Sequence, residues 1–120
     1  MSCKATARHT GDVAIVDLSG RITLGEGSGL VRNTIKDILK DGRRSILLNM
    51  QNVTYIDSAG LGELVGAYAS VTNAGGRIKL LNPQGKVTEV LAVTKLYTVF
   101  ETFSDEGAAV ASFQAGAAGA

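Results

Sequence analysis

The feature that most constrains the fold is an alternation of short apolar runs with segments of helical period. Aliphatic and β-branched runs typical of strands lie at residues 13–18, 45–49 and 77–81. Between and after them, apolar residues recur at the spacing of one helix face in segments that start near Leu30, Leu61 and Val87. Strands that alternate with helices predict an α/β fold whose central strands are mostly parallel.

The two ends of the chain extend this pattern. Residues 5–10 are expected to pair antiparallel with 13–18 across a Gly-Asp turn, which makes the sheet mixed. A short strand is expected at 99–101, and Ser104 followed by two acids is a credible start for a last helix. The expected fold is therefore a central sheet of about five strands packed by about four helices.

The length of 120 residues is typical of one domain, expected over 1–120 with its core at about 5–113. The Ala/Gly tail at 114–120 has no apolar period, and we expect it to be frayed. Twelve basic residues nearly balance eleven acidic ones, for a net charge of +1, which gives no electrostatic footprint for nucleic acid.

The cysteine count and the apolar runs bear on location and cofactors. A single cysteine, Cys3, excludes an internal disulfide and a cysteine-based zinc site, and it fits a reducing compartment. No apolar run approaches the roughly 20 residues that span a bilayer. The N-terminus also lacks the apolar centre of a secretory signal. We expect a cytoplasmic protein without membrane insertion, bound metal or other cofactor.

One stretch carries candidate chemistry: Asp57-Ser58 stands where a strand gives way to a helix, followed by small residues. Three catalytic or nucleotide-binding interpretations fail on the residues. The glycine spacing from Gly60 has Val65 where a dinucleotide loop needs a small residue. The glycine-rich segment 25–29 lacks the Lys-Ser/Thr pair of a phosphate loop. The only histidine, His9, lies in an expected edge strand, and nothing in the sequence places it near Ser58 as a catalytic base.

The interpretation that we favour is that Ser58 is a phosphorylation site. Asp and Ser are both preferred N-cap residues, so capping explains one of the two. The small residues after Ser58 would let another protein approach its hydroxyl. A phosphate there would meet free backbone N–H groups and the positive end of the helix dipole, and it would make a neutral surface strongly anionic.

The residues at this point resemble the signature of STAS domains (sulfate transporter and anti-sigma factor antagonist). The resemblance is carried by 49–62, which contains the string Asp-Ser-Ala-Gly-Leu-Gly, and is supported by 18–22, 75–81 and 91–103. It covers most of 13–113 and is strongest with free-standing bacterial anti-anti-sigma factors. Two residues depart from the common pattern: Ala59 stands where many members have a second serine, and Lys95 where many have glycine.

The resemblance implies a protein that binds an anti-sigma factor and so releases a sigma factor for transcription. The anti-sigma factor would also be a serine kinase that phosphorylates Ser58, and a separate phosphatase would reset the switch. The chain would be substrate and ligand rather than enzyme. The expected partner surface comprises Asp57, Ser58, Ala59, Gly60, Leu61 and Gly62, with Leu24, Gly25 and Glu26 alongside.

Two other functions are compatible with the sequence. A STAS subunit of a stress-signalling or lipid-transport complex would share the fold but not the sigma-factor pathway. A small enzyme using Ser58 would turn over substrate by itself. The sequence does not decide whether Thr54 is a second modified residue, whether a nucleotide binds, or which oligomer forms.

Overall fold

The structure is a computed structural model that describes residues 3–25 and 27–119. The strands are β1 (Cys3–Thr10), β2 (Val13–Ile22), β3 (Ser45–Ile56), β4 (Arg77–Leu81) and β5 (Thr102–Phe103). The helices are α1 (Ser28–Lys40), α2 (Ser58–Asn73), α3 (Gly85–Thr94) and α4 (Glu106–Gly119), and a 3-10 turn (Leu96–Thr98) follows α3. None of the helices in the described part of the chain is long and apolar enough to cross a membrane.

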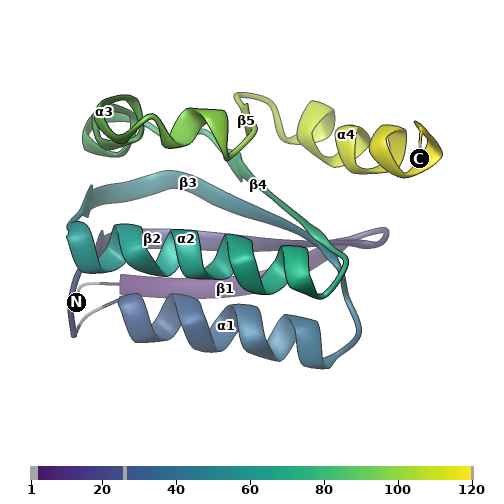
Figure 1. Cartoon of the computed structure of the whole chain (residues 1–120), viewed down its shortest axis with the longest axis horizontal. Helices are drawn as coiled ribbons and strands as arrows, with labels where there is room; N and C mark the ends of the chain where they lie inside the picture. Colours follow the sequence, from purple (N-terminus) through teal and green to yellow (C-terminus); the bar gives the residue numbers. More distant parts are fainter. Residues whose placement is uncertain (1–2, 26, 120) are drawn as a thin grey trace.

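The sheet has the order β1-β2-β3-β4-β5 (Figure 1). β1 pairs antiparallel with β2, and the other three pairs are parallel, so the predicted mixed, mostly parallel sheet is confirmed. Because parallel strands share one direction, β2 and β3 end at the same edge of the sheet. The loop before α1 and the start of α2 follow directly from these two strand ends.

β3 is longer than the sequence predicts. The expected strand stopped at Asn49 and was followed by a polar loop, but β3 continues to Ile56 alongside β2. Three buried residues, Met50, Val53 and Ile56, anchor this extension. Their spacing of three does not fit strand alternation. Two register shifts in the β2–β3 pairing accommodate this spacing, because each shift changes which side chains face inward.

Both faces of the sheet are covered. Along β2, Ala14 and Val16 face the larger core beneath α1, α2 and α3, while Val13 and Ile15 face a smaller core beneath α4. α3 also packs against β3, whose extension runs beyond the end of β4. These contacts bring the start of α2 and one side of α3 to the same end of the molecule (Figure 1).

The region after α3 departs from the sequence prediction. A strand was expected at 99–101, but Lys95 adopts a left-handed conformation at φ 61° and the 3-10 turn follows it. Phe100 is fully buried, with its ring centroid 5.6 Å from that of Tyr68, and β5 follows the expected residues, at Thr102–Phe103. Lys95, which stands where the resemblance leads us to expect glycine, thus adopts a backbone conformation that favours glycine.

The last helix also begins and ends differently from the prediction. Asp105, not Ser104, caps it: the Asp105 carboxylate accepts a hydrogen bond from Ala108 N–H at 2.8 Å. The helix continues to Gly119, although the tail from 114 was expected to be frayed. The physical reason is the helix propensity of alanine, which needs no amphipathic pattern.

Candidate functional site

Asp57 is the residue that starts α2 and joins it to the neighbouring loop. It occupies the N-cap position, where Oδ1 accepts a hydrogen bond from Gly60 N–H at 2.8 Å. Oδ2 accepts a second hydrogen bond, from Leu24 N–H at 3.1 Å. These hydrogen bonds, that from Gly60 first, lower the pKa of Asp57 below its ordinary value. Asp57 is therefore an ionised structural cap that fixes the loop before α1 beside the start of α2.

Ser58 is the first residue of α2, and its side chain points to solvent. Because Asp57 already caps the helix, the Ser58 hydroxyl is not needed for capping. Within 3–25 and 27–119 it takes part in no hydrogen bond. A substituent on this oxygen would lie at the positive end of the helix dipole, where a negative charge is favoured.

The two glycines after Ser58 have different roles. A Cβ on Gly60 would overlap the Ile22 carbonyl oxygen and approach the Ile22 and Ile56 side chains at 2.9 Å. Gly60 is therefore buried where α2 crosses the end of β2. A Cβ on Gly62 would meet nothing within 4 Å, so this glycine leaves the backbone of α2 accessible at the surface.

The predicted partner residues lie together, but they are not all accessible. Ser58 and Gly62 are exposed, Asp57, Ala59 and Leu61 are half-buried, and Gly60 is buried. Leu61 packs partly against the main core. Only part of the predicted segment can therefore contact a partner directly.

The predicted loop lies beside this helix start. Leu24 is tied to Asp57 through its backbone, while its side chain is 77% exposed. Gly25 is exposed in a left-handed conformation at φ 84°. Glu26 lies outside the described residues. The Leu24 backbone is thus fixed at Asp57 while its apolar side chain stays in contact with solvent.

The sequence did not predict that α3 lies across a groove from Ser58. A groove of about 560 Å³ separates the two elements. Tyr55, Ser58 and Leu61 line one side, and Lys86, Glu89 and Val93 line the other. Val93 is 80% exposed. The available signal was that Val93 is an apolar residue outside the helical face formed by Val87 and Leu91.

His9 lies at the opposite end of the sheet from Ser58. It pairs with Ala14, which pairs with Ile46 near the start of β3, whereas Ser58 follows the end of that strand. Ten residue steps along β3 separate Ile46 from Ile56, or roughly 33 Å at the usual rise. His9 cannot act as a base for Ser58 in this fold.

The described residues also include no group of three or more His, Cys, Asp or Glu side chains that could hold a metal ion. Thr54, the other hydroxyl considered, is exposed and donates to the Gly20 carbonyl oxygen at 3.3 Å. The arrangement around Ser58 thus offers an exposed hydroxyl, a fixed carboxylate and apolar side chains on two flanks.

Comparisons with known proteins agree with this fold. The STAS domain family matches residues 4–109 of the chain. A Thermotoga neapolitana homologue of the protein TM1081 is 35% identical over 72 residues, which are 58% of this chain and 64% of the relative. The chain therefore spans slightly less than two thirds of that relative's length.

Two further comparisons cover most of both chains. An anti-sigma F factor antagonist from Paenibacillus polymyxa is 25% identical over 107 residues, which are 88% of this chain and 91% of the relative. The crystal structure of TM1081 from Thermotoga maritima superposes with a TM-score of 0.81 at 25% identity. It covers 92% of this chain and 94% of that one.

Proposed function

The chain belongs to the STAS domain family, and from this premise we propose that it is an anti-sigma factor antagonist controlled by phosphorylation of Ser58. The observation that carries the proposal is the division of roles at the start of α2. Asp57 supplies the cap, and Ser58 presents a hydroxyl with no structural task. The similarity to the anti-sigma F factor antagonist of Paenibacillus polymyxa supports the same function.

In the unmodified state, the partner contacts a surface that is partly apolar and carries no charge on Ser58. Leu24 and Val93 stand exposed on either side of Ser58, and the open position at Gly62 lets a partner backbone come close to α2. Burial of these apolar side chains would supply much of the binding free energy. The partner is an anti-sigma factor, which the bound chain displaces from its sigma factor.

Phosphorylation would reverse this binding without unfolding the chain. A phosphoserine adds a charge of about −1.5 to −2 at neutral pH. At the first position of α2 this charge interacts favourably with the helix dipole, so the fold tolerates it. In the complex, however, the phosphate would lose its hydration between two protein surfaces, which is costly without a matching cation.

The kinase activity belongs to the partner. His9 lies far from Ser58, so the base that accepts the hydroxyl proton during phosphoryl transfer is supplied by the anti-sigma factor acting as an ATP-dependent serine kinase. A separate phosphatase restores the free hydroxyl. The chain itself is a binding module and a substrate.

The proposal is tested by a pull-down from a lysate of the cells that encode the chain. Wild-type and Ser58→Ala proteins should retain an anti-sigma factor, and Ser58→Asp should retain much less of it. The matched control is Ser70→Asp, which places the same charge on an exposed site of the same helix about 18 Å further along. Equal capture by Ser58→Asp and Ser70→Asp, or recovery of a transporter ATPase in place of an anti-sigma factor, would overturn the proposal.

A further inference from the structure

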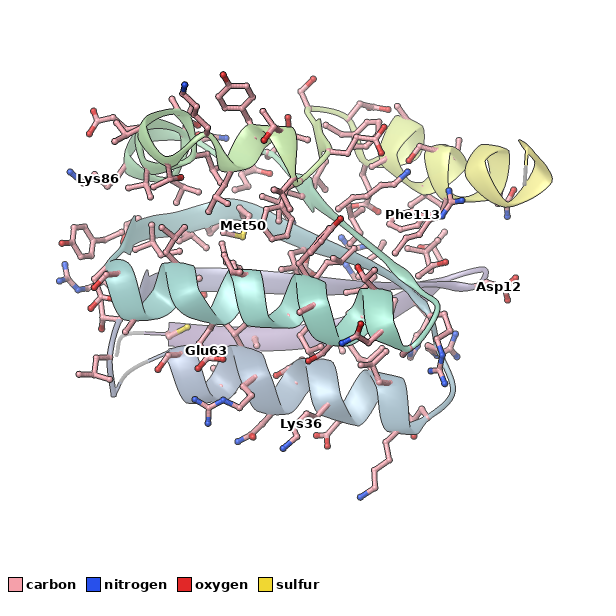
Figure 2. The ribbon with its side chains drawn as sticks, viewed as in Figure 1. Asp12, Lys36, Met50, Glu63, Lys86 and Phe113 are labelled. Carbon is pink, nitrogen blue, oxygen red and sulfur yellow. The ribbon has the colours of Figure 1, made fainter. Side chains whose placement is uncertain are left out.

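The groove beside Ser58 contains one pair of opposite charges from α3. Lys86 and Glu89 both line it, and their side chains approach to 3.4 Å between Nζ and Oε1. Figure 2 shows Lys86 at the end of the molecule where α2 begins. Ser58 lines the opposite wall of the same groove. A cation from one helix therefore faces the proposed modification site on another.

We propose that Lys86 is the counter-ion of phosphorylated Ser58, binding the phosphate across the groove and joining α3 to the start of α2. This inference rests on the proposed modification of Ser58 and adds to it a receptor for the phosphate within the chain itself. The phosphate then does more than add charge. It draws the Lys86 side chain across the groove and covers the apolar surface between Leu61 and Val93.

The present partner of Lys86 is a weak competitor for it. The Lys86 and Glu89 side chains are 47% and 70% exposed, and ion pairs of this kind in water contribute little. A phosphate offers three acceptor oxygens and nearly twice the charge of a carboxylate. Lys86 would therefore exchange Glu89 for the phosphate when Ser58 is modified.

Of the polar side chains that line the groove, Lys86 is the one suited to bind the phosphate. Asp57 is anionic, and its carboxylate is engaged by the N–H groups of Gly60 and Leu24. Tyr55 is held under the Arg21 guanidinium, whose central carbon lies 4.6 Å from the ring centroid. Among the groove residues, Lys86 is the one cation. Without it, the phosphate would face two carboxylates.

The test is a phosphorus NMR titration of the full chain carrying phosphoserine incorporated at position 58 during synthesis. The second pKa of a free phosphoserine is about 6, and a nearby cation lowers it. Lys86→Gln should raise this pKa by about half a pH unit relative to the otherwise wild-type phosphoprotein. Glu89→Gln should lower it, because a competing and repelling carboxylate is removed.

The matched control is Lys36→Gln, an equally conservative change at an exposed residue of α1, away from the groove (Figure 2). It should leave the phosphate pKa unchanged. Equal pKa values in the Lys86→Gln and Lys36→Gln proteins would overturn the inference. Because the phosphate is introduced without a kinase or partner, this result does not depend on the pull-down. Equal capture by Ser58→Asp and Ser70→Asp in the pull-down would contradict the proposed function but not the role of Lys86.

Discussion

At the scale of single residues, Asp57 and Ser58 divide two tasks that the sequence leaves ambiguous. Both are good N-cap residues, but only Asp57 lies in the extended conformation before the helix and accepts the Gly60 N–H. Because the pKa of Asp57 is lowered, the cap stabilises the fold above the pKa that the group has when unfolded. This contribution is lost as the pH falls through the folded-state pKa. A charge added to Ser58 would therefore leave that cap in place.

The two glycines of the motif give a matched pair of substitutions. Gly60→Ala should destabilise the fold by about 1–3 kcal/mol, because the new methyl group overlaps the Ile22 carbonyl oxygen and α2 must shift. Gly62→Ala should stabilise it by about 0.5–1 kcal/mol, because the site is open and alanine favours the helix. Urea unfolding of both variants measures the difference. Equal effects would show that α2 does not pack on β2 as described.

Between elements, an ionic network fastens α4 to the sheet. The Arg8 guanidinium donates from Nε to Asp17 at 2.7 Å and from a terminal nitrogen to Glu106 at 2.7 Å. Asn49 donates to Asp17 at 2.8 Å. Hydrogen bonds from Arg8 lower the pKa of both carboxyl groups. The network joins β1, β2, β3 and the first turn of α4.

The Arg8 network predicts a contribution to stability that depends on pH. Both carboxyl groups have lowered folded-state pKa values, so their contribution is complete above the unfolded values near 4 and is lost as the pH falls further. Arg8→Met should cost about 1 kcal/mol at neutral pH, since the groups are partly exposed, and less at pH 3. Urea unfolding at the two pH values tests this. A cost that does not change with pH would contradict it.

The sequence predicts elements well where one pattern dominates. The bounds of β4 agree with the predicted run at 77–81, and α2 begins at Ser58, where the sequence predicts a change from strand to helix. The extension of β3 was missed because it depends on pairing with β2, which is a tertiary property. β5 was misplaced because Phe100 is buried against Tyr68 rather than paired in the sheet.

The candidate site shows the same limit. The segment from Asp57 and the loop at Leu24 were both singled out from the sequence, since each has an unusual local composition. The contribution of α3 to the groove was not predicted. Helical periodicity identifies the buried face of α3 at Val87 and Leu91, but it does not say which element lies beside the exposed face. Lys86 and Val93 come to the groove only through packing of α3 against β3.

At the scale of the whole molecule, the chain is a single STAS domain whose proposed switch lies at one end of the sheet. The ends of β2 and β3 supply the loop with Leu24 and the start of α2, and α3 adds the third side. The Arg8 network fastens α4 to the opposite face of the sheet from α2. A phosphate can therefore change the binding surface while both cores stay intact.

We propose that a phosphate on Ser58 decides whether the chain binds an anti-sigma factor. The most direct measurement is calorimetric titration of each purified anti-sigma factor encoded in the same genome with the unmodified chain and with the chain carrying phosphoserine at 58. We expect that one of them binds the unmodified chain and that the phosphate weakens this binding about a hundredfold, because the phosphate would lose its hydration in the interface. Equal affinity for the two forms would contradict it.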